Sequence, residues 1–524
     1  MVDDQRDAIA FLSDPSSYGS GIGSVEHHAT HISHVFLAGE RAYKLKRAVK
    51  YPYLDFSTVE LRHDFCEAEL ALNRRTAPEL YLEVRPIVRG VDGKPAWGAG
   101  PAGVRINAND TIIDWVVVMR RFDQDLLLSA IAKADVPDRA LLFALAAAIA
   151  SFHEAAPQRV ENGRFEAIEE TIGENDTCLR ACGEAGFPDE KIGWLRDRSS
   201  EWLRRVGPLL DRRRLEGKVR RCHGDLHTRN ICILDGKPVL FDCLEFSDEL
   251  ASIDVLYDLA FLLMDLAHLG RAEAANLVFN RYLDLTGDDG GLPALPLFIA
   301  LRAAIRAHVT GSALQQASPD SAGPAEALAY LDEACAVLEP APPRLVAIGG
   351  LSGTGKSTLA AALAPELGAR PGARILRSDV IRKRLFGLAP EARLPEAGYS
   401  TGTTERVYAA LRDGAARALR AGFSAIIDAV ALREDERQAF AQVARELNVP
   451  FLGLWLEAPT ETIAARVDTR RNDASDATRE VVEQQSRFDP GKLDWRRIDA
   501  GAGATAVLAT ARRLLRRPVD RRGG

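Results

Sequence analysis

Two short motifs in this chain have the residue types and the spacing that handle nucleotide phosphates. Residues 350–357 read Gly-Leu-Ser-Gly-Thr-Gly-Lys-Ser, the pattern G-x-x-x-x-G-K-[ST], in which a glycine-rich turn directs backbone N–H groups at phosphate oxygens. Residues 223–230 read His-Gly-Asp-Leu-His-Thr-Arg-Asn, the spacing H-x-D-x-x-x-x-N, which puts an acceptor-side carboxylate and a metal-binding amide on one loop. Together the motifs predict a phosphotransferase with two sites.

The first of these motifs has the neighbours that a phosphate loop requires. The apolar run 345–348 predicts a buried strand that enters the loop, and residues 356–361 open a helix. Lys356 is expected to reach the β- and γ-phosphates of a nucleotide, and Ser357 is expected to bind Mg²⁺. The loop residues that we expect to bind the nucleotide are Gly350, Ser352, Gly353, Thr354, Gly355, Lys356, Ser357 and Thr358.

Two carboxylates follow predicted strands of the same half of the chain. The apolar strand 425–428 ends in Asp428, which is expected to orient the metal or a water molecule; an aspartate that only caps the next turn is the alternative. A strand over 374–379 presents Asp379 at its C-terminal end, and ligands of parallel α/β sheets lie beyond such ends. Asp379 is therefore a candidate to face an acceptor hydroxyl.

Positive charge flanks these acids. Arg382 is predicted on the helix that begins after Asp379, and a helix over 460–471 carries Arg466 and Arg470. Cations on such a helix can close over a phosphoryl group during its transfer. We therefore expect Arg466 and Arg470 to bind the nucleotide.

The second motif gathers polar groups at one end of a hairpin. The runs 231–234 and 239–241 predict two short strands about an Asp-Gly turn. Asp225 and Asn230 lie on the loop before them, and Asp242 follows the second strand. This set can accept a hydroxyl proton and hold Mg²⁺ against a triphosphate.

Upstream residues can position the phosphates of a nucleotide. Residues 34–49 predict a hairpin, and Lys44 and Lys46 share one face of its second strand. The helix predicted over 58–75 carries Glu67 and Glu69. Kinase folds pair a strand lysine with a helix glutamate, but strands and helices also carry these residues for solubility alone. The pattern leaves open which lysine and which glutamate form the pair.

A buried strand runs through 115–122 into a short polar connection. A kinase fold has its adenine-contacting hinge at this place, so Met119 is a candidate nucleotide contact. Two other features are set aside. Gly19, Gly21 and Gly23 precede the first predicted strand and are expected to form a lead-in, and the histidines at 27, 28, 31 and 34 lack the spacing of a metal site.

Composition bounds the class of protein. The 524 residues are too many for one ordinary core, and 47% apolar with 27% charged residues is typical of a globular protein. A net charge of -7 gives no general attraction to nucleic acid or to an anionic membrane. The seven cysteines have no metal-ligand spacing, and the N-terminus lacks a basic and an apolar signal segment. These features favour a cytoplasmic protein with reduced thiols.

The clearest boundary is the proline-rich segment 339–343, because proline stops the preceding helix and stiffens the chain. We predict a first domain over residues 1–338 and a second over residues 344–524. The sequence contains no internal repeat.

The first domain resembles the aminoglycoside phosphotransferase and choline kinase branch of the protein-kinase-like superfamily. The resemblance rests on His223–Asn230, on Phe241–Phe246, which is similar to I-D-x-E, and on Asp258-Leu259-Ala260. It implies a bilobal α+β fold in which Asp225 is the catalytic base. One extra residue precedes Glu245, so the part played by that glutamate stays open.

The same resemblance assigns further parts. It implies that Asn230 and Asp242 bind Mg²⁺ and that Lys46, or failing it Lys44, contacts the phosphates. Gly224 stands where protein kinases have the arginine of H-R-D, and no A-P-E signature follows. A small-molecule acceptor is therefore favoured over a protein.

The second domain resembles the small P-loop kinases of the gluconate kinase, polynucleotide kinase and zeta-toxin neighbourhood, which have AAA-type ATP-binding domains. The residues that carry the resemblance are Ser378–Arg382, similar to S-D-x-x-R, and Arg466 with the segment 470–477, similar to a lid. It implies an α/β fold with a parallel sheet, in which Asp379 faces the acceptor hydroxyl and Arg382 holds the acceptor. The whole chain is similar to bacterial fusions of these two domains.

The sequence therefore predicts an ATP- and Mg²⁺-dependent phosphotransferase that acts on hydroxyl groups of small molecules such as a sugar, amino sugar, cyclitol or amino alcohol. Two alternatives stay open. The P-loop domain modifies a nucleic-acid end or a nucleotide sugar, or one domain binds ATP only as a regulatory module. The motifs do not identify either acceptor, the oligomeric state, the choice between ATP and GTP, or communication between the sites.

Overall fold

The computed structural model describes residues 3–51, 54–90, 92–98, 111–315, 323–468 and 474–516. The chain has a mixed α/β fold. It divides into two compact units, Met1–Arg164 with Arg213–Leu262, and Phe165–Arg212 with Leu263–Gly524. The second unit therefore holds helices from before the proline-rich segment together with the P-loop half of the chain.

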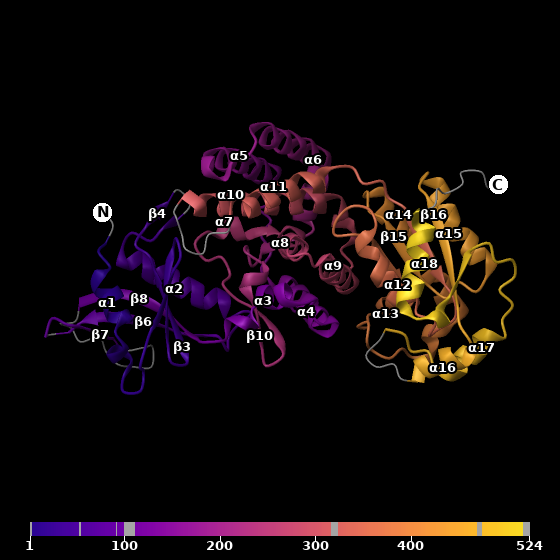
Figure 1. The fold of residues 1–524 in the computed structure, drawn as a ribbon, viewed down its shortest axis with the longest axis horizontal. Helices are drawn as coiled ribbons and strands as arrows, with labels where there is room; N and C mark the ends of the chain where they lie inside the picture. The colour runs from indigo at the N-terminus through magenta and orange to yellow at the C-terminus, as the bar shows by residue number, and fades with distance from the viewer. Residues whose placement is uncertain are drawn as a thin grey trace. The chain divides into compact units, whose positions relative to one another are not determined.

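The first unit is built on an antiparallel sheet of six strands. Their order is β1 (Glu26–Ala29), β2 (Ser33–Ala38), β3 (Arg41–Lys46), β8 (Thr111–Arg120), β6 (Tyr81–Arg89) and β7 (Pro95–Trp97). Helix α2 (Val59–Asn73) packs against β8 and β6 and crosses one face of this sheet (Figure 1). Thr58 begins the helix, because its side chain accepts the N–H of Leu61.

The hairpin predicted over 34–49 is confirmed as β2 and β3. Its two-residue turn places Gly39 at φ 57°, and a Cβ there would lie 2.7 Å from the side chain of Ile22. Because side chains alternate along a strand, Lys44 and Lys46 on β3 point to the same face. That face is the one that α2 covers.

The rest of the first unit surrounds the loop 223–230. Its helices are α3 (Leu128–Ala134), α4 (Arg139–Ala155), α7 (Asp248–Ala251) and the first part of α8 (Val255–His268). Its short strands are β9 (Val219–Arg221) paired with β12 (Ser252–Asp254), and β10 (Ile231–Leu234) paired with β11 (Lys237–Leu240). Asp235 and Gly236 turn the second hairpin with positive φ angles of 50° and 74°, as the Asp-Gly signal predicts.

Helices form the first part of the second unit. They are α5 (Phe165–Ala181), α6 (Asp189–Leu215), α9 (Ala272–Thr286), α10 (Leu295–Gln315) and α11 (Pro324–Leu338). Helix α10 packs on α5 and α11 (Figure 1). Among the described residues, the stretch Asp289–Leu314 is long and apolar enough to cross a membrane, but 72% of its most apolar window is buried inside the protein. A core helix of a folded protein has this property.

The P-loop half of the second unit is a five-stranded parallel sheet. The strand order is β14 (Arg374–Arg377), β15 (Ala425–Asp428), β13 (Leu345–Gly349), β16 (Phe451–Glu457) and β17 (Arg496–Asp499). Ile375 belongs to the core that α12 (Lys356–Leu363) and α18 (Ala504–Arg516) cover. Leu376 points to the other face, where α14 (Thr401–Arg420) brings Gly414 against it. Helices thus cover both faces, as parallel sheets require.

Helix α9 lies along the outer edge of β14 and replaces a neighbouring strand. The side chain of Asn280 accepts the N–H of Ile375 at 2.7 Å and donates to the carbonyl of Ala373 at 3.1 Å. Asn276 donates to the carbonyls of Pro371 and Ala373 at 3.0 and 3.2 Å. The two asparagines satisfy backbone groups that an edge strand otherwise exposes. This packing explains why the compact units do not divide at residues 339–343.

Candidate active sites

The loop between β9 and β10 brings two predicted catalytic residues together. The side-chain nitrogen of Asn230 donates to the Asp225 carbonyl and to Asp225 Oδ2, both at 2.9 Å. His227 Nε2 lies 3.4 Å from the same carboxylate. Asn230 is buried, whereas the side chain of Asp225 is 41% exposed, so its carboxylate can reach an incoming group. The amide thereby fixes the direction of the Asp225 carboxylate.

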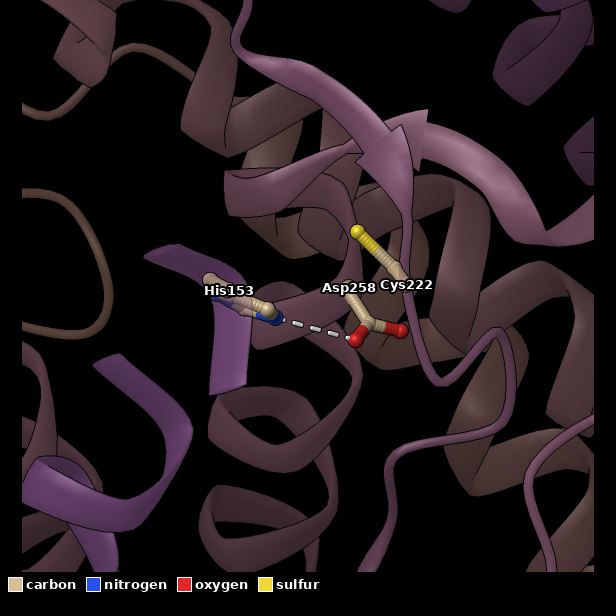
Figure 2. A group of neighbouring side chains, drawn as sticks. All are labelled: His153, Cys222 and Asp258. Atoms are coloured by element: carbon tan, nitrogen blue, oxygen red, sulfur yellow. Dashed lines mark hydrogen bonds and ion pairs between the residues drawn. The ribbon is translucent and has the colours of Figure 1, made fainter. Parts of the chain in front are cut away.

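Asp258 holds the start of this loop. Its Oδ1 accepts the N–H of Gly224 at 2.9 Å, and its Oδ2 accepts the N–H of His223 at 3.1 Å. Figure 2 shows His153 reaching the same carboxylate, with Nε2 3.1 Å from Oδ2. Gly224 has φ 86°, and a Cβ there would lie 2.9 Å from the Cβ of Ala251. Only glycine fits this position, so H-G-D cannot become H-R-D here.

His153, Cys222 and Asp258 form a buried group whose possible ligand atoms lie within 4.8 Å of one another (Figure 2). A metal ion would compete with the contacts that these groups already make. Asp258 accepts two backbone N–H groups, and Cys222 Sγ lies 3.5 Å from the carbonyl of Ile253. The geometry fits an anchor for the catalytic loop.

Two lysines and three carboxylates meet beside the loop, under α2. Lys44 Nζ lies 2.8 Å from Glu69 Oε1 and 2.6 Å from Asp242 Oδ1. Lys46 Nζ lies 2.7 Å from Glu69 Oε2 and also pairs with Glu245. Lys46 and Glu69 are fully buried, whereas the Asp242 side chain is 39% exposed. The chain of ion pairs therefore runs from the core to an accessible carboxylate.

The pKa values follow from this arrangement. Burial alone would raise the pKa of Glu69, but the ammonium groups of Lys44 and Lys46 outweigh it and lower that pKa to about 2. Burial raises the pKa of Glu245, although its ion pair with Lys46 opposes this rise. Burial alone would lower the pKa of Lys44, but the carboxylates of Asp242 and Glu69 outweigh it and raise that pKa well above its ordinary value. Lys44 therefore carries its charge next to the predicted metal carboxylate.

Of the two glutamates that the sequence left open, the structure brings Glu69 and not Glu67 to the lysines. The Glu67 side chain is 55% exposed and lies 3.8 Å from His63. Glu69 points to the lysines because it is two residues further along α2, which turns by about 200° over that distance. Met119 is buried in the sheet core with Val117 near the C-terminal end of β8, and its part in adenine binding stays a prediction.

The phosphate loop joins β13 to α12 through glycines with positive φ. Gly350, Gly353 and Gly355 have φ angles of 131°, 90° and 95°. A Cβ on Gly350 would lie 2.4 Å from the carbonyl of Leu456, so the backbone there leaves no room for a side chain. Lys356 Nζ donates to the carbonyls of Gly350 and Leu351, both at 2.9 Å. The Lys356 side chain thus folds back across the loop and binds the carbonyls of its first two residues.

The acids predicted on the neighbouring strands lie beside this loop. Ser357 Oγ donates to Asp428 Oδ2 at 2.6 Å, and Arg377 Nε lies 3.4 Å from the same oxygen. The strand expected to reach Asp379 ends at Arg377, because Ser378 and Asp379 form the first turn of α13 (Ser378–Arg384), where an acidic residue is favoured. Burial raises the pKa of Asp379, and Arg377 opposes this rise.

Two of the arginines predicted to bind ligands, Arg382 and Arg466, donate hydrogen bonds within the protein. Arg382 donates to the carbonyl of Gly398 at 2.8 Å and to Thr404 Oγ1 at 3.2 Å. Arg466 donates to the carbonyl of Ala500 at 3.0 Å. Arg470 lies outside the described residues.

Thr358 is exposed on α12, and its part in nucleotide binding stays a prediction. The sequence left the part played by Glu245 open, because its spacing departs from the family pattern. Sequence reasoning missed Asn280 and Gln485, which lie in no motif. Gln485 accepts the N–H of Ser352 at 2.9 Å. Contacts of this kind depend on the packing of distant helices and leave no local pattern.

Comparison with known proteins agrees with both halves. A model described as the phosphotransferase enzyme family matches residues 99–298, and a model described as an AAA domain matches residues 345–490. The resemblances inferred from the motifs and the predicted fold class are thereby confirmed. The chain is an ATP-dependent kinase with two kinase-like domains.

The chain belongs to the family of the protein Rv2004c of Mycobacterium tuberculosis (strain H37Rv). The two are 30% identical over 478 residues, which covers 89% of this chain and 91% of that protein. The protein Mb2027c of Mycobacterium bovis has the same identity and coverage.

Two solved structures are similar to parts of the chain. A choline/ethanolamine kinase family protein from Mesorhizobium loti is 17% identical with a TM-score of 0.37, covering 63% of this chain and 92% of that one. A gluconokinase from Sinorhizobium meliloti 1021 is 18% identical with a TM-score of 0.24, covering 32% of this chain and 89% of that one.

Proposed function

We propose that both domains transfer the terminal phosphate of ATP to hydroxyl groups of small molecules, with Mg²⁺ as the metal. The acceptor of the first site is a sugar, amino sugar, cyclitol or amino alcohol. One observation carries this proposal. The Asn230 amide holds the Asp225 carboxylate at 2.9 Å on a loop that Asp258 anchors through two backbone N–H groups. This is a fixed and accessible proton acceptor beside oxygen ligands.

At the first site, Asp225 accepts the proton of the acceptor hydroxyl. The hydroxyl oxygen forms a bond to the γ-phosphorus while the bond from that phosphorus to the β,γ-bridging oxygen breaks, and ADP leaves. Lys44, 2.6 Å from Asp242, supplies positive charge near the phosphates. Phosphoryl transfer asks little covalent chemistry of the protein, so positioning and charge account for the rate.

The donor atoms at both sites suit Mg²⁺, which prefers oxygen ligands. Asn230 and Asp242 offer an amide and a carboxylate oxygen at the first site. Ser357 and Asp428, whose oxygens lie 2.6 Å apart, offer a hydroxyl and a carboxylate at the second. A bound Mg²⁺ would neutralise phosphate charge during transfer.

At the second site, Lys356 and the loop N–H groups bind the phosphates and Asp379 receives the acceptor proton. The raised pKa of Asp379 supports this role, because a stronger base accepts a hydroxyl proton more readily. We propose that Arg382 holds the loop around Gly398 that borders the acceptor.

Small acceptors fit the first site better than proteins. Between Asp242 and the start of α8 at Val255 the chain has only the four-residue helix α7 and the three-residue strand β12. That length offers no platform for a peptide. At the second site the cations near Asp379 have protein partners: Arg377 meets Asp428, and Lys383 meets Asp476 at 3.1 Å. This pairing argues against a nucleic-acid end as acceptor. We further propose that the protein acts in the cytoplasm.

The test is an ADP-release screen over a panel of hydroxylated metabolites with the wild-type chain, Asp225→Ala and Lys356→Ala. We expect Asp225→Ala to abolish turnover of one group of acceptors while ATP binding is retained, and Lys356→Ala to abolish another. Asp225-dependent labelling of proteins, without any small acceptor, would overturn the assignment of the first site. If Lys356→Ala changes no turnover, the second domain is a regulatory ATP-binding module.

A further inference from the structure

Two helices lie directly on the phosphate loop. These are α16 (Thr460–Asp468) and α17 (Arg479–Ser486). A Cβ placed on Gly353 would meet the side chains of Ile463 and Val467 on α16, each at 2.8 Å. Val482 on α17 is fully buried and packs with these two residues and with Leu351 of the loop. Both helices are therefore fixed against the loop by apolar packing.

One polar side chain of α17 contacts the loop backbone. Gln485 lies three residues after Val482, and residues at that spacing share one face of a helix. Its Oε1 accepts the N–H of Ser352 at 2.9 Å. Ser352 is 8% exposed, and its N–H belongs to the turn whose backbone donors bind phosphate in loops of this pattern. The side chain of Gln485 thus lies at the turn of the loop that is expected to bind phosphate.

The hydrogen bond fixes the orientation of the Gln485 amide. A backbone N–H donates only to an acceptor, so the side-chain carbonyl oxygen of Gln485 faces the Ser352 N–H. The NH₂ group of the same amide therefore points away from that N–H. That NH₂ group provides two donors beside the loop. Donors of this kind form strong hydrogen bonds to phosphate oxygens, since one partner is charged.

We propose that Gln485 is a nucleotide-binding residue of the second site, which contacts the terminal phosphate. Its Oε1 stays on the Ser352 N–H and its NH₂ group donates to the terminal phosphate, while the other N–H groups of the loop bind the phosphates. The inference rests on the proposed function of the second site as a kinase, and it adds a contact that neither the phosphate loop nor Arg466 of α16 supplies. It also explains why a neutral amide, and not an acid, faces the loop.

Two substitutions separate this role from a structural one. Gln485→Glu keeps an oxygen for the Ser352 N–H but replaces the donor group by negative charge. Gln485→Leu removes both hydrogen-bonding groups. Gln484→Glu is the matched control, because it makes the same change at the exposed neighbouring position of α17.

The affinities for ADP and for a non-hydrolysable ATP analogue are measured by calorimetry on the full chain, in an Asp242→Ala background that weakens nucleotide binding at the first site. We expect Gln485→Glu to weaken binding of the ATP analogue by at least about tenfold, as lost hydrogen bonds to a charged group do, and to change ADP binding much less. Gln484→Glu leaves both affinities unchanged. The thermal midpoint of Gln485→Glu stays that of the parent.

The outcomes distinguish this inference from the function it rests on. If Lys356→Ala abolishes binding at the second site but Gln485→Glu and Gln485→Leu leave the ATP analogue bound as tightly as the parent, Gln485 is a packing residue and the inference fails. If Lys356→Ala also leaves binding unchanged, the second site does not bind nucleotide and the proposed function fails with it. Equal weakening of ADP and the ATP analogue would likewise exclude a contact with the terminal phosphate.

Discussion

Arg374 on β14 donates from Nε to Asp289 Oδ1 at 2.7 Å, and both side chains are buried. A second acid, Asp284, accepts from Arg374 Nη1 at 2.8 Å. Burial alone would lower the pKa of the Arg374 guanidinium, but the two carboxylates outweigh it and raise that pKa above its ordinary value. This cluster joins the edge strand of the P-loop sheet to the helices that precede the proline-rich segment. Since β14 leads directly to the helix that carries Asp379, the cluster also helps to fix the position of Asp379.

Removal of Arg374 should destabilise the second unit. Arg374→Met leaves Asp284 and Asp289 buried without their cation, and breaking a buried ion pair in this way costs about 3–5 kcal/mol. Urea denaturation followed by tryptophan fluorescence measures the effect. The matched control is Arg512→Met, because Arg512 pairs with Glu366 at the exposed surface. We expect a much smaller change for Arg512→Met, and equal effects of the two variants would show that the buried cluster is not a stabilising element.

The two lysines of β3 should separate stability from catalysis. Lys46 lies in the core between Glu69 and Glu245, so Lys46→Met should cost about 3–5 kcal/mol by leaving buried carboxylates unpaired. Lys44 contacts the accessible Asp242, so Lys44→Met should lower first-site turnover by at least about a hundredfold, as loss of an electrostatic contact to the transition state does.

Urea denaturation and initial rates on both variants measure these effects. A stable Lys46→Met variant without turnover, together with an active Lys44→Met variant, would assign the phosphate contact to Lys46.

Stability should fall in weak acid because of His34. Burial, together with His27 and Arg47, lowers the pKa of His34 to about 4, and His27 Nε2 lies 3.0 Å from His34 Nδ1. The folded state therefore binds this proton less tightly than the unfolded chain, whose histidine has a pKa of about 6.5. The stabilisation from neutral His34 is present above pH 6.5 and is lost as the pH falls from 6.5 towards 4.

Thermal midpoints between pH 7 and pH 5 test this dependence, because most carboxylates stay ionised in that range. We expect the wild-type midpoint to fall more steeply than that of His34→Gln. His28→Gln, at an exposed position of the neighbouring strand β1, should retain the wild-type slope. Parallel curves for wild type and His34→Gln would contradict the prediction.

The sequence predicted the parts of the site that lie within one loop. The placement of Asp225 and Asn230 on one loop and the strand, loop and helix around Lys356 follow from short motifs whose spacing sets the local backbone. The choice between Glu67 and Glu69 could not be made, because it depends on which face α2 turns to the sheet. Asn280 could not be found for a similar reason. Its role comes from packing between segments almost a hundred residues apart, and local periodicity carries no record of it.

Catalysis at the second site should depend on Asp379 and on pH in a defined direction. Burial raises the pKa of this carboxyl above its ordinary value, so a proton leaves it at higher pH than it leaves an exposed aspartate. A base must be deprotonated to accept the hydroxyl proton, and kcat/KM for the second-site acceptor should therefore rise with pH through the raised pKa and then level off. Asp379→Asn should lower the rate by at least about a hundredfold, as loss of a general base does, and should leave ATP affinity unchanged. Rates from pH 4 to 8 with both proteins measure the acid limb, and Lys356→Ala, which loses ATP affinity, serves as the contrasting variant. A pH profile that Asp379→Asn leaves unaltered would remove Asp379 from the catalytic residues and identify it as a helix-capping acid at the start of α13.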